Sequence, residues 1–143
     1  MNYLPLRDIA NAAAALGGEA ALAYFCRSDL QVEQKSDDSP VTAADRAAEA
    51  AIKAHIAAAC PEDGWLGEET GTTTGTSGRR WIVDPIDGTR NFVRGVPLWA
   101  TLVACEEGDR VVAAAVHIPA LGERYYAGAN LSYQFDFGAL SLG

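Results

Sequence analysis

The chain contains 143 residues and carries a formal net charge of −8, from 11 Lys and Arg against 19 Asp and Glu. Its 49% hydrophobic and 21% charged residues are enough for one buried core, which excludes a disordered polypeptide. The acidic balance argues against nucleic-acid and anionic-membrane partners, and the longest uncharged run, residues 111–122, is too short to span a bilayer. Three cysteines without C-x-x-C spacing predict buried, reduced thiols, so we expect a cytoplasmic protein.

The first half of the sequence predicts two helices separated by a polar segment. Alanine and larger apolar residues recur at helical spacing from Leu6 to Phe25, where Gly17-Gly18 either weakens the helix or lets another backbone come close. Ala43–Ala59 predicts a stronger helix, because Thr42 before it is a good N-cap. The polar, acidic residues 28–39 between the two helices indicate a loop or a hairpin.

The second half of the sequence predicts short strands. Gly/Thr-rich residues 71–78 lack the G-K-[ST] ending of a phosphate loop, so we expect a plain flexible loop there. His117 and the three tryptophans fall within or beside apolar runs and are expected in the core. Helices followed by strands favour an α+β fold, with two helices packed on a largely antiparallel sheet. The strands are predicted at 64–67, 80–83, 98–105, 111–118 and 124–127.

Acidic residues follow two of the apolar runs directly, at the points where the predicted strands end. Glu68 and Glu69 follow the first of these runs, Asp84 follows the second, and Asp87 lies three residues further on. The proline and glycine around Asp87 predict a tight turn that aims two carboxylates at one point. Such oxygen ligands suit Mg²⁺, and Asp84 could bridge two ions, as in two-metal phosphoester hydrolysis. Any single one of these acids could instead be a solvated loop residue, but the intact Asp-Pro-Ile-Asp-Gly-Thr set favours a metal site.

Three motifs occur in order along the chain: Lys35-x-Asp37-x-Ser39-Pro40-Val41-Thr42-x-Ala44-Asp45, Gly67-Glu68-Glu69, and Asp84-Pro85-Ile86-Asp87-Gly88-Thr89-x-Asn91-Phe92. Together they resemble the motifs of the inositol monophosphatase family, which comprises Mg²⁺-dependent, lithium-sensitive phosphomonoesterases. The resemblance covers residues 5 to 128 and implies a layered αβ sugar-phosphatase-like fold. Residues 1–130 would form its N-terminal metal- and phosphate-binding part. Family members are considerably longer, so the C-terminal half, which brings a further metal-binding aspartate, is expected to be absent.

The resemblance assigns metal ligands to residues of the second and third motifs. Glu68 and Asp84 would hold a first Mg²⁺, helped by the carbonyl of Ile86, and Glu68 would thereby act in catalysis. Asp84 and Asp87 would hold a second ion. Two or three Mg²⁺ ions in all, and inhibition by lithium, are expected on this basis.

The resemblance also assigns roles around the attacking water and the phosphate. Thr89, hydrogen-bonded to Asp45, would orient the water, and the amides of Gly88 and Thr89 would bind the phosphate. Lys35 and Glu69 would lie just outside the metal ligands. From the residues alone, Asp45 is equally well interpreted as part of a helix cap, and Lys35 as a solvated loop charge.

The segment after the third motif indicates a branch of the family. It reads Phe92-Val93-Arg94-Gly95-Val96-Pro97 and is similar to the histidinol-phosphatase branch. The implied reaction is hydrolysis of a small phosphate monoester, histidinol phosphate in histidine biosynthesis, by metal-activated water. Inositol 1-phosphate or a broad range of sugar phosphates is the alternative. A truncated, non-catalytic metal-binding domain is the second alternative, and a homodimer is a further expectation.

The last residues, 131–143, do not match the family pattern. Four apolar residues alternate with polar ones from 131 to 137, which predicts a half-buried strand. Such a strand could cover a sheet edge or present an apolar face to a partner. A frameshift at a truncation point is a third explanation for this atypical tail.

Overall fold

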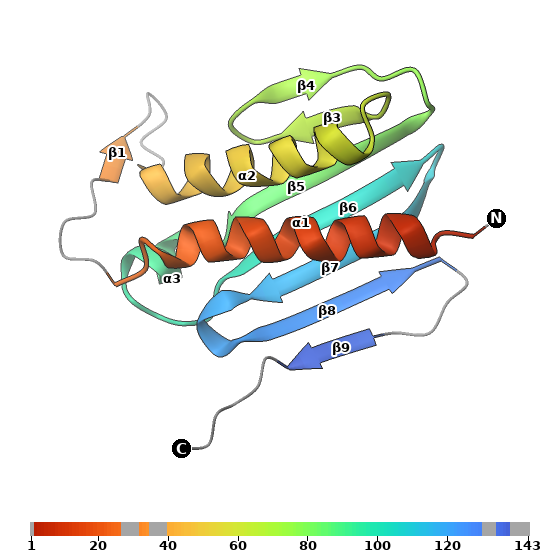
Figure 1. Cartoon of the computed structure of the whole chain (residues 1–143). Coiled ribbons are helices and arrows are strands. Elements are labelled where there is room, and N and C mark those ends of the chain that lie inside the picture. Colours follow the sequence, from red (N-terminus) through yellow and green to blue (C-terminus); the bar gives the residue numbers. More distant parts are fainter. Residues whose placement is uncertain (1, 27–31, 35–39, 130–133, 138–143) are drawn as a thin grey trace.

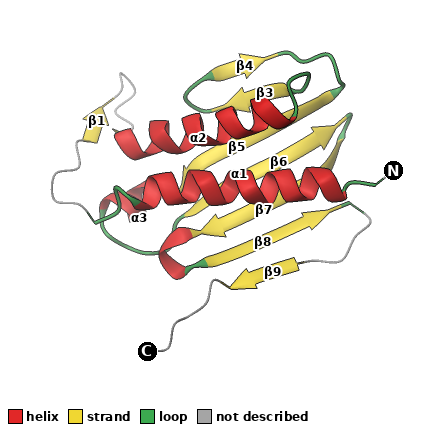
Figure 2. Ribbon diagram, in the orientation of Figure 1, coloured by secondary structure: helices red, strands yellow, loops and turns green. Residues whose placement is uncertain are grey.

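The computed structural model describes residues 2–26, 32–34, 40–129 and 134–137. Helices α1 (Leu4–Leu22) and α2 (Ala43–Ala59) pack against each other and lie across one face of a seven-stranded sheet (Figure 1). Figure 2 shows this two-layer arrangement, with the short helix α3 (Thr89–Val93) at one end of the sheet. No helix among the described residues combines the length and the hydropathy needed to cross a membrane.

The order of strands across the sheet is β4-β3-β5-β6-β7-β8-β9. Only β3 and β5 run parallel among the neighbouring pairs described, and the other pairs are antiparallel. The predicted α+β fold, with two helices on a largely antiparallel sheet, is therefore confirmed. The strands are β3 (Gly64–Gly67), β4 (Gly71–Thr73), β5 (Arg79–Asp87), β6 (Ala100–Glu107), β7 (Arg110–Ile118), β8 (Glu123–Gly128) and β9 (Gln134–Phe137), with a 3₁₀ turn at Pro119–Leu121.

Several elements differ from the sequence prediction. The expected flexible loop at 71–78 begins with strand β4, because the left-handed Gly71 (φ 74°) makes a tight hairpin with β3. The strand expected to end before Asp84 continues as β5 to Asp87, and the helix α3 was not predicted. Two further elements agree with the prediction. The hairpin alternative is confirmed for the polar segment, because β1 (Val32–Gln34) pairs antiparallel with β2 (Pro40–Thr42), just beyond residue 39. The strand predicted in the tail is present as β9, which pairs with β8 and covers its side.

The core lies between the two helices and the sheet. Four alanines on the inner face of α1 are at most 1% exposed, and their small side chains bring the helix close to the strands: Ala10, Ala13, Ala14 and Ala21. The three tryptophans are at most 4% exposed, as predicted. Burial raises the pKa of Cys105 to about 12, whereas Cys60 is partly buried. The prediction of buried thiols is wrong for Cys26, which is exposed.

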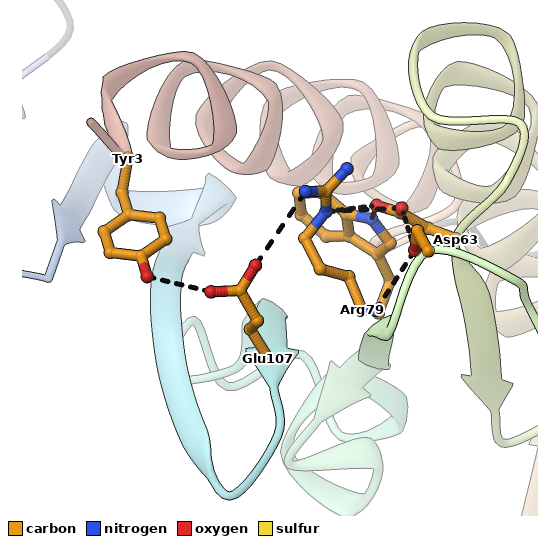
Figure 3. A network of polar contacts seen from close by, with 6 residues as sticks. Tyr3, Asp63, Arg79 and Glu107 are labelled. Atoms are coloured by element: carbon orange, nitrogen blue, oxygen red, sulfur yellow. Dashed lines mark hydrogen bonds and ion pairs between the residues drawn. The ribbon is translucent and has the colours of Figure 1, made fainter. Parts of the chain in front are cut away.

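A buried carboxylate, Asp63, links the residue before β3 to the beginning of β5 through hydrogen bonds and an ion pair (Figure 3). Its side chain is 1% exposed. Burial alone would raise the pKa of Asp63, but its hydrogen bonds outweigh burial and lower the pKa. Glu107 extends the network, since it lies 3.9 Å from Arg79 and accepts the Tyr3 hydroxyl at 2.8 Å. The donors to Asp63 are Ser77 Oγ (2.6 Å), Trp81 Nε1 (2.8 Å) and Arg79 Nε (3.3 Å).

The glycine pair in α1 allows side chains, rather than another backbone, to approach the helix. A Cβ atom on Gly17 would lie 2.5 Å from Ile52 Cδ1, and one on Gly18 would lie 2.1 Å from Nδ1 of His117. His117 is 7% exposed, as expected for a core residue, and its Nδ1 donates to the carbonyl of Ala14 at 3.1 Å. The helix remains continuous across both glycines.

We expect Gly18→Ala to destabilise the protein by about 1–3 kcal/mol, because the new methyl group displaces a packed imidazole. Helix propensity alone predicts the opposite sign, with a gain of about 1 kcal/mol. Urea unfolding measures the difference. A His117→Ala background should remove part of the loss, since the new Cβ would still lie 2.8 Å from Pro119 Cγ. An equal loss in both backgrounds would contradict the role given to the imidazole.

Candidate active site

The parallel pairing of β3 with β5 brings two acidic residues to one edge of the sheet. In this pairing Gly67 lies opposite Val83, so each strand is followed at the same level by its acidic residue. Glu68 follows β3, and Asp84 continues β5. Two carboxylates separated by 16 positions in the sequence therefore become neighbours at the sheet edge.

The last residues of β5 form an irregular segment against β6. The pairing register shifts between Asp84 and Asp87, where Pro85 has no N–H to donate. The carbonyl of Pro85 instead accepts the buried hydroxyl of Thr101 at 2.8 Å. The Ile86 carbonyl accepts the hydroxyl of Thr89 at 3.1 Å. Side-chain hydroxyls thus replace lost ladder hydrogen bonds and hold the two aspartates in place.

Negative charge accumulates around Asp84. Burial raises the pKa of Asp84 to about 6, and the charges of Glu68 and Asp87 add to this effect, opposed by a backbone hydrogen bond at Ile86. One carboxylate oxygen of Asp84, Oδ1, is buried and has no hydrogen-bond partner in the described part of the chain. A divalent cation would satisfy this oxygen and offset the repulsion, so the residues fit a metal ion.

The acids alone do not form a closed metal cage. No group of three or more His, Cys, Asp or Glu side chains within residues 2–26, 32–34, 40–129 and 134–137 is arranged to hold a metal ion by itself. Mg²⁺ commonly uses one or two carboxylates and completes its shell with water and substrate oxygens. The arrangement around Asp84 therefore suits Mg²⁺ better than a metal that needs only protein ligands.

Helix α2 adds two acidic side chains on its core face. Asp45 is 4% exposed and Glu49, one turn later, is fully buried. Glu49 was not predicted to have a role. The sequence indicates only weakly that Glu49 is buried. Glu49 follows Asp45 by four residues and therefore lies on the same face of the helix as Ile52, an apolar residue of the core. The burial of Asp45 means that it faces the core, beyond any contribution to a helix cap.

A cavity of about 300 Å³ adjoins Asp87 and Gly88. Gly88 has φ 90°, a left-handed conformation that starts α3. The side-chain amide of Asn91 donates to the Leu98 carbonyl at 2.8 Å, which holds together the two ends of the segment 91–98. The cavity is lined by Asp87, Gly88, Asn91, Leu98, Trp99, Ala100 and Ile118.

The structure brings most of the predicted site residues to this edge of the sheet. Glu68 and the residues from Asp84 to Thr89 lie at the ends of β3 and β5. The Glu69 N–H is bound by Glu49. The Thr89 hydroxyl donates to the backbone carbonyl of Ile86. The predicted hydrogen bond between Thr89 and Asp45 stays a prediction. Lys35 lies outside the described residues.

Comparisons with known proteins point to one family. The model of the inositol monophosphatase family matches residues 2–136. The chain is 49% identical over 110 residues to the histidinol-phosphatase of Chlorobaculum parvum, covering 77% of this chain and 42% of that protein. It is 45% identical over 98 residues to the inositol-1-monophosphatase of Mesorhizobium japonicum, covering 68% of this chain and 37% of that protein. The chain thus spans less than half the length of these curated relatives.

Solved structures show the same fold. The extragenic suppressor protein suhB of Bartonella henselae matches with a TM-score of 0.86 and 32% identity, over 92% of this chain and 52% of that one. The inositol monophosphatase of Zymomonas mobilis matches with a TM-score of 0.77 and 34% identity, over 96% of this chain and 52% of that one. From the family model, the relatives and the shared fold, the chain belongs to the inositol monophosphatase family.

Proposed function

We propose that residues 1–130 form the metal- and phosphate-binding part of a Mg²⁺-dependent phosphomonoesterase whose substrate is histidinol phosphate. The observation that carries this proposal is the buried, unpartnered oxygen of Asp84 beside the charges of Glu68 and Asp87. The choice of substrate rests on relatives named histidinol-phosphatase, at 46–50% identity. The relatives named inositol-1-monophosphatase, at 45–46% identity, support inositol 1-phosphate as the alternative.

In this proposal the acidic edge of the sheet holds the metal. Glu68, Asp84 and the Ile86 carbonyl would bind the first Mg²⁺, and Asp84 and Asp87 the second. When bound, Mg²⁺ would withdraw charge from the phosphate and lower the pKa of the attacking water. The cavity beside Asp87 would receive the alcohol part of the substrate, and its volume of about 300 Å³ suits a small molecule.

The chain's own groups would position water and phosphate. The Thr89 hydroxyl now donates to the Ile86 carbonyl, and it would exchange this bond for one to the Asp45 carboxylate. As the Thr89 oxygen takes a proton from the attacking water, its own proton would pass to Asp45. The N–H groups of Gly88 and Thr89 would donate to phosphate oxygens. Gly88 is exposed and has no side chain to obstruct that approach.

A second candidate function is metal binding without turnover. It is favoured by the arrangement of the acids, since no group of three or more metal-binding side chains occurs among the described residues. In that case the ligands that complete the second metal site would come from outside the described residues.

Phosphate release tests the proposed reaction. We expect the purified chain to release inorganic phosphate from histidinol phosphate only with Mg²⁺, faster than from inositol 1-phosphate, and lithium to inhibit it. Asp84→Asn should lower the rate at least about 100-fold, because a direct ligand matters more than an outer-shell residue. Faster release from inositol 1-phosphate would reverse the substrate assignment. Mg²⁺ binding without release would favour the second candidate.

The unfavourable charge of Asp84 gives a separate prediction on stability. The folded-state pKa of Asp84, about 6, lies above its ordinary value of 3.8, so its ionisation lowers the free energy of unfolding as pH rises from about 4 to about 6. Without metal at pH 7, Asp84→Asn should therefore stabilise the protein by about 1–2 kcal/mol after allowance for partial exposure.

Thermal unfolding in a chelating buffer measures this gain. The same variant should lose the stabilisation that Mg²⁺ gives to the wild type. Asp109→Asn is the matched control, because it removes the same charge from an exposed turn and should change neither quantity. A destabilised Asp84→Asn variant in metal-free buffer would contradict the charge argument.

A further inference from the structure

Glu49 is the most deeply buried acidic side chain described in α2, with no exposed surface. Its two carboxyl oxygens lie 3.0 and 3.1 Å from the backbone nitrogen of Glu69, and both accept its N–H. Burying a carboxyl group carries a large desolvation cost, which one backbone hydrogen bond offsets only in part. An apolar residue would fill this core position at lower cost, so packing alone does not account for the acid.

The partner of Glu49 is the turn that carries Glu68. This turn connects β3 to β4, and a 2.7 Å hydrogen bond from Trp65 Nε1 to Thr70 Oγ1 also holds it. Gly67 makes the close approach of α2 possible. A Cβ atom there would lie 2.7 Å from Glu49 Oε1 and 2.5 Å from Trp65 Nε1. The carboxyl group of Glu49 and the turn are therefore fitted to each other, and Glu68 lies between Gly67 and the bonded N–H of Glu69.

We propose that Glu49 is a positioning residue, which fixes the backbone on either side of Glu68 and thereby sets where the Glu68 carboxylate lies relative to Asp84. The inference deepens the proposed function, because the position of Glu68 matters for a metal ion held with Asp84. Glu49 does not contact the metal or the substrate in this proposal. It links the core face of α2 to the acidic edge of the sheet through a single backbone amide.

Two substitutions at Glu49 separate the hydrogen bond from the charge. Glu49→Met fills the same space but accepts no hydrogen bond from Glu69, whereas Glu49→Gln keeps one carbonyl oxygen for it. Asp63→Asn is the matched control, because Asp63 is also a buried acid that accepts hydrogen bonds, at the opposite end of β3. Gly67→Ala is a second test that leaves Glu49 in place but displaces its carboxyl group.

The first readout is hydrogen exchange of the Glu69 amide in the metal-free chain, measured by NMR. We expect exchange at Glu69 to accelerate about tenfold or more in Glu49→Met and Gly67→Ala, and to stay within about threefold of the wild type in Glu49→Gln and Asp63→Asn. Unchanged exchange in Glu49→Met, or an equal acceleration throughout the chain, would overturn the proposal.

The second readout is the Mg²⁺ dissociation constant from calorimetry, with Mg²⁺ alone as the probe. It should rise about tenfold or more in Glu49→Met and Gly67→Ala, and stay near the wild-type value in Glu49→Gln and Asp63→Asn. Faster amide exchange with unchanged Mg²⁺ affinity would also overturn the inference. A wild-type chain that binds no Mg²⁺ would refute the proposed function instead, while the exchange measurement still decides the role of Glu49.

Discussion

The candidate site depends on one backbone constraint, the parallel alignment of β3 with β5. Parallel strands end at the same edge of a sheet, so the residues that follow Gly67 and Val83 come together there. Had these strands run antiparallel like their neighbours, Glu68 and Asp84 would lie at opposite ends of the sheet, about 13–16 Å apart. The bonds of Thr101 and Glu49 to nearby backbone groups refine this geometry. They do not create it.

The same alignment divides the sheet into two ends with different electrostatics. At the start of β3 and β5, Asp63 pairs with Arg79 and accepts three hydrogen bonds, and the pKa of Asp63 is lowered. At the other end, Asp84 faces further acids, one of its oxygens lacks a described partner, and the pKa of Asp84 is raised. At the first end, charges and hydrogen bonds are therefore paired. The second end retains an unfavourable charge arrangement, as ligand-binding sites commonly do.

Local sequence patterns predicted the two long helices, most strands and the acids that follow the apolar runs. They could not predict that β3 pairs parallel with β5, because strand pairing depends on contacts far apart in the chain. The extension of β5 was missed because Pro85 normally ends a strand. Here the hydroxyl of Thr101, from the neighbouring strand, satisfies the carbonyl of Pro85. Glu49 was missed because an acid on an alanine-rich helix usually faces water, and only the packed structure places it in the core.

The two outermost strands of the described sheet, β4 and β9, have a consequence for assembly. Unpaired backbone groups on an edge strand are a template on which further chains can add, and long edges favour fibrils. Here β9 covers the side of β8, and the outermost strands, β4 and β9, contain three and four residues. Such short edges offer few hydrogen bonds to an incoming strand. Addition of a strand to either described edge would therefore gain little from backbone hydrogen bonds.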